Sequence, residues 1–124
     1  MAKEKILLVE DDTNLVKAIT IRLEASDYVV VAAIDGEEGL KKAQSEKPDL
    51  IILDIMLPKI NGFDICRKLK VDKLYKGIPI IMLTAKFQPS DINFGKAMGA
   101  DAYITKPFDS QALLVKIKEL LKKQ

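Results

Sequence analysis

Hydrophobic residues gather in five short, nearly continuous runs that are separated by longer amphipathic segments. The runs are too short for stable helices and most are rich in β-branched residues, so they predict β-strands. Continuous apolarity indicates that both faces of each strand are covered, which is typical of a parallel sheet between helices. The predicted strands are Ile6 to Val9, Tyr28 to Ala33, Leu50 to Leu53, Ile78 to Leu83 and Ala102 to Ile104.

The segments between these runs carry the spacing of apolar positions that is expected of helices lying on a sheet. In Thr13 to Ala25, for example, Leu15, Ile19 and Leu23 fall on one face of a helix. Alternating strands and helices predict a doubly wound α/β sheet, in which ligands bind outside the carboxyl ends of the strands. The other predicted helices are Gly36 to Ser45, Gly62 to Leu74, Pro89 to Met98 and the segment from Asp109 or Ser110 onward.

The composition narrows the functions that such a protein could have. The chain has 124 residues, which suits one domain spanning 1–124, and its net charge of +2 argues against direct binding of nucleic acid. It contains no histidine, which excludes Ser-His-Asp catalysis, histidine zinc sites and a phosphohistidine of its own. A single cysteine, and no apolar run near the roughly 20 residues of a membrane span, favour a cytoplasmic protein without membrane contact.

Polar residues that could carry chemistry follow four of the predicted strands. Glu10 and Asp11 come after the first strand, Asp54 after the third, Thr84 after the fourth and Lys106 after the fifth. Because these ends meet at one edge of a parallel sheet, the carboxylates would repel one another unless a divalent cation lay between them. Oxygen ligands favour Mg2+, and Asp54 is placed as a nucleophile that could accept a phosphoryl group. Thr84 and Lys106 would then donate hydrogen bonds to its oxygens.

Each of these residues also has an ordinary structural explanation. An acidic run before a helix is commonly a capping cluster, and an Asp, a Thr or a Lys-Pro pair at a strand end is commonly part of a turn. Their occurrence together at matching strand ends favours a functional site.

Four motifs of the chain resemble the receiver domain of bacterial two-component response regulators, and the resemblance covers essentially the whole chain. It implies a chemotaxis-regulator-like fold, which is a flavodoxin-like (βα)5 three-layer sandwich with a parallel sheet in the order 2-1-3-4-5. The motifs are ILLVEDD at Ile6 to Asp12, LDIMLPKINGFD at Leu53 to Asp64, PIIMLTA at Pro79 to Ala85 and GADAYITKPF at Gly99 to Phe108.

The resemblance also implies roles for single residues at the acidic edge. Asp54 is the expected phosphoacceptor. Asp11 and Asp54 are expected to ligate Mg2+ directly, Glu10 through water, and Met56 through its backbone carbonyl. The phosphoryl group would come from a sensor histidine kinase or a histidine phosphotransfer protein, so that the domain is a signalling switch and not an enzyme with a substrate of its own.

A second group of residues is expected to read the phosphoryl group. By the resemblance, Thr84 and Lys106 contact it, and the movement of Thr84 lets Tyr103 rotate inward. This remodels the surface of the fourth helix, fifth strand and fifth helix and changes the affinity for a downstream protein partner. Lys106–Pro107 is expected to be a cis peptide bond, which proline tolerates.

The chain departs from one branch of the family, the winged-helix transcription factors, whose active dimers are joined by ion pairs across that surface. Ile92, Ala102 and Ala112 stand where that branch tends to carry charged residues, and only Asp101 and Lys116 look compatible. We therefore expect a single-domain regulator that is a monomer or a phosphorylation-dependent dimer. The alternative is a receiver domain from a longer regulator with a DNA-binding or enzymatic output.

Three further hypotheses fit less well. A phosphohydrolase of the haloacid-dehalogenase type needs a second acid two residues after the nucleophile, where this chain has Met56. A flavodoxin-like cofactor binder needs a Gly-rich loop where this chain has Glu10, Asp11 and Asp12. A degenerate receiver that signals without phosphate would not need the complete set of site residues.

Overall fold

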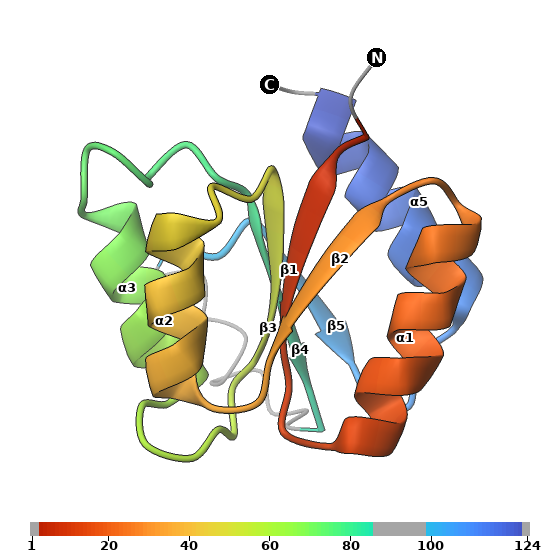
Figure 1. Cartoon of the computed structure of the whole chain (residues 1–124), viewed down its shortest axis with the longest axis horizontal. Helices are drawn as coiled ribbons and strands as arrows, with labels where there is room; N and C mark the ends of the chain where they lie inside the picture. The colour runs from red at the N-terminus through yellow and green to blue at the C-terminus, as the bar shows by residue number, and fades with distance from the viewer. Residues whose placement is uncertain (1–2, 86–98, 123–124) are drawn as a thin grey trace.

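A parallel sheet with helices on both of its faces forms the computed structural model, which describes residues 3–85 and 99–122 (Figure 1). The five strands lie in the order β2-β1-β3-β4-β5, which confirms the predicted doubly wound, flavodoxin-like sandwich. The strands are β1 (Lys5–Val9), β2 (Val29–Ala33), β3 (Leu50–Asp54), β4 (Ile80–Thr84) and β5 (Ala102–Thr105). The described helices are α1 (Thr13–Ala25), α2 (Gly36–Ser45), α3 (Gly62–Lys70) and α5 (Ser110–Lys122).

Each face of the sheet has its own hydrophobic core. Alternate residues of a strand point to opposite faces, so Ile6 and Leu8 of β1 pack with the buried residues of α1 and α5. Leu7 and Val9 of the same strand pack with those of α2 and α3. Figure 1 shows the same division, with α2 and α3 on one side of the sheet and α1 and α5 on the other. Burial on both faces explains the continuous apolar runs of the sequence.

Side-chain caps fix where the helices begin. Asp12 accepts hydrogen bonds from the backbone N–H groups of Asn14 and Leu15 at 3.0 and 3.2 Å, which starts α1. Asp35 and Asn61 cap α2 and α3 in the same way. The predicted bounds of α1 and α2 are thereby confirmed. Within the described part of the chain, no helix has the length and apolar composition needed to cross a membrane.

The prediction that the third helix continues to Leu74 was wrong, because α3 ends at Lys70. Asp72 accepts a hydrogen bond from the Leu74 N–H at 2.9 Å, a local side-chain bond that competes with the helical pattern. The fourth strand also begins later than predicted, at Ile80, since the Ile78 N–H donates within the preceding turn and Pro79 has none to donate. The helix predicted at Pro89 to Met98 lies outside the described residues.

Candidate functional site

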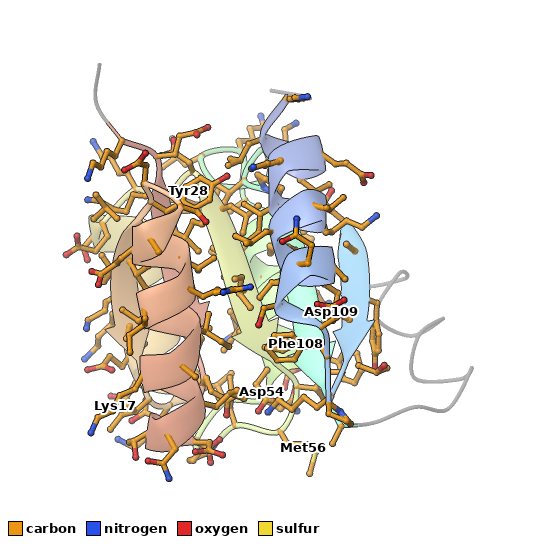
Figure 2. All side chains as sticks on the ribbon, turned by 90° about the vertical axis from the view of Figure 1, so that its right-hand side faces the viewer. Lys17, Tyr28, Asp54, Met56, Phe108 and Asp109 are labelled. Atoms are coloured by element: carbon orange, nitrogen blue, oxygen red, sulfur yellow. The ribbon has the colours of Figure 1, made fainter. Side chains whose placement is uncertain are left out.

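The carboxyl ends of β1 and β3 bring three acidic side chains together at one edge of the sheet. Glu10, Asp11 and Asp54 each offer a carboxylate oxygen, and these atoms all lie within 4.8 Å of one another. Glu10 and Asp54 are buried, at 1% and 4% exposure, whereas Asp11 is exposed. Figure 2 shows Asp54 at the same end of the molecule as Met56, with Tyr28 at the opposite end. The predicted convergence of these three residues is therefore present in the structure.

Lys106 places its ammonium group between the two buried carboxylates. Its Nζ donates to Oε1 of Glu10 at 2.7 Å and to Oδ2 of Asp54 at 3.1 Å. The second oxygen of Glu10 accepts from the Asp12 N–H at 3.0 Å, and the second oxygen of Asp54 accepts from the Met56 N–H at 3.1 Å. Both oxygens of each buried carboxylate are therefore hydrogen-bonded, which offsets the cost of removing them from water.

Burial and charge act in opposite directions on the ionisable groups of this cluster. Burial raises the pKa of Glu10, and the negative charge of Asp54 adds to this, while hydrogen bonds from Lys106 and the Asp12 backbone act against it. Burial alone would lower the pKa of Lys106, but the hydrogen bonds to Glu10 and Asp54 and the negative charges of these carboxylates together outweigh burial and raise it. The geometry thus favours a charged ammonium group at the centre of the site.

The loop from β3 to α3 packs too closely for a side chain at Gly62. A Cβ atom there would collide with the backbone oxygen of Asp54 and lie 2.8 Å from Cα of Ile55. The Gly62 N–H donates to the Ile55 oxygen at 2.9 Å, which folds the loop back over the end of β3. The sequence predicted that a helix begins at Gly62, but it did not predict the contact of Gly62 with the Asp54 backbone, for which the Asn-Gly pair is the only signal.

A pocket of about 370 Å3 lies beside Asp11 and was also missed from the sequence. Asp11 and Asn61 give it a polar part beside its apolar walls. No spacing of residues in the loop motif predicts this pocket. Its walls are Asp11, Ile55, Met56, Leu57, Pro58, Asn61 and Phe63.

Two predicted switch residues lie on β4 and β5. Leu83 pairs with Asp54 in the sheet register, so Thr84, the next residue, reaches the same edge through its backbone. The Thr84 side chain lies outside what the structure describes. Tyr103 is half-buried on β5 and packs against the core shared with α2 and α3. The Lys106–Pro107 peptide bond is cis, as predicted.

The residues expected to be compatible with a family dimer make ion pairs within the chain. Asp101 accepts from Lys70 at 2.8 Å, and Lys116 pairs with Glu119 at 3.0 Å. Ile92, which was named with Ala102 and Ala112 as a departure from that dimer, lies outside the described residues.

The donor set at the acidic edge suits a hard divalent cation. All the side-chain ligands on offer are carboxylate oxygens, and there is no histidine in the chain to make a softer site. Both Glu10 oxygens already accept hydrogen bonds, whereas Asp11 is exposed and makes none as an acceptor in the described part of the chain. Asp11 is therefore the better candidate for a direct ligand, because both oxygens of Asp54, like those of Glu10, already accept hydrogen bonds.

Comparison with curated proteins finds close relatives over nearly all of the chain. The alkaline phosphatase synthesis transcriptional regulatory protein PhoP of Bacillus subtilis is 47% identical over 120 residues, which are 97% of this chain and 49% of PhoP. The response regulator ArlR of Staphylococcus saprophyticus is also 47% identical over 120 residues, covering 97% of this chain and 53% of ArlR. The chain thus spans about half the length of the curated relatives it matches.

Solved structures and a family model agree with these relatives. A CheY-like response regulator receiver domain protein from Methanospirillum hungatei superposes with a TM-score of 0.91 at 37% identity, covering 98% of this chain and 95% of that one. The chemotaxis protein CheY4 of Vibrio cholerae gives 0.89 at 34% identity, covering 96% and 99%. The sequence model of the response regulator receiver domain matches residues 6–118. The chain belongs to the response regulator receiver domain family of two-component signalling proteins.

Proposed function

We propose that the chain is a phosphorylation-activated switch of a two-component phosphorelay and that Asp54 is its phosphoacceptor. The observation that carries this proposal is the state of the Asp54 carboxylate. It is 4% exposed, fixed by hydrogen bonds from the Met56 N–H and Lys106 Nζ, and next to two further carboxylates. A nucleophile held in one orientation meets the geometric requirement of phosphoryl transfer.

The transfer itself is a substitution at phosphorus. An oxygen of the Asp54 carboxylate forms the new P–O bond, and the bond from phosphorus to the donor nitrogen breaks with its electron pair left on that nitrogen. The donor nitrogen belongs to a phosphohistidine of a partner protein, because this chain has no histidine. The ammonium group of Lys106, now 3.1 Å from Asp54, is close enough to pair with an oxygen of the transferred group.

Mg2+ held by Asp11 and Asp54, by Glu10 through water and by the Met56 carbonyl would neutralise charge between the carboxylates and the phosphoryl oxygens. The fit rests on the oxygen-only cluster whose ligand atoms lie within 4.8 Å of one another. Lys106 supplies the one cation of this cluster that belongs to the described chain. Its pairing with both buried carboxylates keeps the site compact before any transfer takes place.

The output is a change in the affinity for a downstream protein. Thr84, at the end of β4, donates to the phosphoryl group in this proposal, and Tyr103 on β5 moves inward in response. A local change of charge is thereby converted into a change of surface, with a coupling free energy of about 1–3 kcal/mol as is usual for allosteric proteins. Dimerisation on phosphorylation is a second form that this output could take.

We infer that residues 1–124 act as a cytoplasmic receiver domain whose direct partners are proteins. A second candidate is a receiver domain that controls a DNA-binding output on the same polypeptide. This candidate is favoured by PhoP, a transcriptional regulatory protein of which the chain covers 49%. In both cases the receiver chemistry is the same and nucleic acid is not bound by the receiver itself.

Intact-mass spectrometry with acetyl phosphate as the phosphodonor tests the proposal. We expect the wild type to gain one phosphoryl group in the presence of Mg2+, and neither Asp54→Asn nor the wild type with a chelator to gain it. No adduct on folded, Mg2+-binding wild type would overturn the proposal in favour of a degenerate receiver that captures partners without phosphate.

A further inference from the structure

The loop between α3 and β4 exposes two large hydrophobic side chains at the end of the domain opposite to Asp54. Val71 is 76% exposed and Leu74 is 81% exposed. Figure 1 shows this loop at the end of the sheet where both chain termini lie, whereas the loops that follow β1 and β3 lie at the other end. The exposed side chains therefore belong to a surface separate from the acidic site.

Hydrogen bonds hold this loop in one conformation. The side chain of Asp72 accepts from the Leu74 N–H at 2.9 Å. The backbone oxygen of Asp72 accepts from the N–H groups of Tyr75 and Lys76 at 3.1 and 2.9 Å. The exposed Leu74 therefore lies on an ordered turn. Binding of a partner would cause little further loss of conformational entropy in this turn.

Lys70 fixes the same loop from the inside. Its ammonium group pairs with Asp101 at 2.8 Å and donates to the backbone oxygens of Lys76 and Ile78 at 3.2 and 2.8 Å. The Lys70 side chain is only 15% exposed, and its bond to the Ile78 oxygen is partly buried. The loop is therefore anchored both at its turn and at its junction with β4.

A pocket of about 410 Å3 opens beside Leu74, between this loop and the end of α2. Its volume is within the range of ligand pockets and is enough for one or two large side chains. Most of its lining is apolar. The lining residues are Gln44, Lys47, Pro48, Leu74, Tyr75 and Ile78.

Lys47 lines this pocket, and Lys73 and Lys76 flank Leu74 and Tyr75 in the loop. All three lysines are exposed, and in the described part of the chain none of their side chains has an ion-pair partner. The neighbouring carboxylate of Glu46 is already engaged by Lys5 at 3.3 Å. An apolar pocket with one unpaired ammonium group in its wall and two more on the adjoining loop is complementary to an apolar side chain flanked by carboxylates.

We propose that this surface, which comprises the pocket with Lys73 and Lys76, docks a protein segment that carries carboxylates on both sides of one large apolar side chain. The apolar side chain enters the pocket against Leu74 and Tyr75, and the carboxylates pair with the lysines. The docking uses no group of the acidic site, so it adds a second, phosphate-independent contact to the switch.

Fluorescence anisotropy with a short synthetic peptide tests this docking. The probe carries a Phe flanked by Glu residues, and its control carries Lys in place of every Glu. We expect saturable, salt-sensitive binding of the Glu peptide alone. Leu74→Asn should weaken this binding roughly tenfold or more, because the variant lacks the apolar side chain that docking buries. Lys73→Gln with Lys76→Gln should weaken it several-fold, roughly, at low salt.

A matched pair of variants on α1 controls for nonspecific effects. Ile21 is 69% exposed and Lys17 is exposed. Ile21→Asn with Lys17→Gln therefore removes an exposed apolar side chain and a positive charge at a different surface, and it should leave peptide binding unchanged. The titrations contain no Mg2+ or phosphodonor, so their result does not depend on the chemistry of Asp54.

Three results would overturn the docking proposal. The first is no saturable binding, or an equal loss in the control pair. The second is Leu74-dependent dimerisation in sedimentation equilibrium without peptide binding, which would make a second copy of the chain the occupant. The third is Leu74-dependent flotation with vesicles of anionic lipid without peptide binding, which would make the surface a membrane contact.

Discussion

Replacing Lys106 by methionine measures how much one ammonium group stabilises two buried carboxylates. Lys106 Nζ lies 2.7 Å from Glu10 and 3.1 Å from Asp54, whose side chains are 1% and 5% exposed. Methionine keeps most of the length and apolar contact of the lysine side chain but removes the charge. The variant therefore leaves two carboxylates close together with no cation between them.

The size of the effect follows from the burial of the three groups. Removing one member of a fully buried ion pair costs about 3–5 kcal/mol, whereas an exposed pair contributes about 0–1 kcal/mol. The Lys106 side chain is 22% exposed, so water already screens part of the interaction. Glu10 can also take up a proton in the variant, because burial already raises its pKa, and this limits the loss. We expect the free energy of unfolding to fall by about 2–3 kcal/mol.

Urea denaturation followed by circular dichroism, near neutral pH and with a chelator present, gives this value. Lys116→Met is the matched control, because Lys116 and Glu119 form an ion pair with side chains 40% and 54% exposed. It should lose less than about 0.5 kcal/mol. Mg2+ should stabilise the Lys106→Met variant by supplying a positive charge to the same carboxylates. Equal losses in the two variants would refute the idea that Lys106 compensates the buried charges.

Three other predictions concern the loop beside the site, the buried thiol and the lifetime of the phosphorylated form. Gly62→Ala should destabilise the protein by about 1–3 kcal/mol in urea, because its Cβ meets backbone atoms, while Gly77→Ala, with nothing near its Cβ, should change stability by less than about 0.5 kcal/mol. Burial raises the pKa of the Cys66 thiol from 9.0 to about 11, so its contribution to stability is complete below pH 9.0 and is lost as the pH rises to about 11. The difference in unfolding free energy between wild type and Cys66→Ala should shrink over that interval, and a constant difference would contradict the assignment. Met56 is 61% exposed and cannot orient an attacking water, so phosphorylated Asp54 should be long-lived, and Met56→Glu should shorten its lifetime roughly tenfold or more in a gel-shift decay assay. A wild-type half-life of seconds would count against this view.

The sequence predicts the layers and the strand ends well because both follow from strong local patterns. Runs such as Leu50 to Leu53 are apolar on both faces, and such a run is typical of a parallel strand that has helices packed on both sides. The predictions for the C-terminal end of α3 and the start of β4 were less accurate, since both depend on competition between side-chain and backbone hydrogen bonds around Asp72 and Pro79. The differences in free energy between these hydrogen-bonding patterns are small, and the spacing of apolar residues carries no information about them.

At the candidate site, the sequence predicts which residues converge but not the contacts that their atoms make. Parallel topology brings Glu10 and Asp54 to one edge, and the sequence order of the strands is sufficient to expect it. The position of Lys106 between the two carboxylates was not predicted, because it depends on the reach of one flexible side chain that follows the end of β5. The contact of Gly62 with the Asp54 backbone likewise depends on a loop conformation that only the assembled fold defines.

The division of the interior into two cores has a consequence for how the domain opens. The helices on the two faces are coupled mainly through strands whose neighbouring side chains, such as Leu7 and Leu8, belong to different cores. One helical layer can therefore loosen while the sheet and the other layer keep their packing, which is the condition for a partly unfolded state below the global transition. In such a molecule, amide hydrogens of β1 and β3 exchange last, and the two helical layers lose protection as separate units.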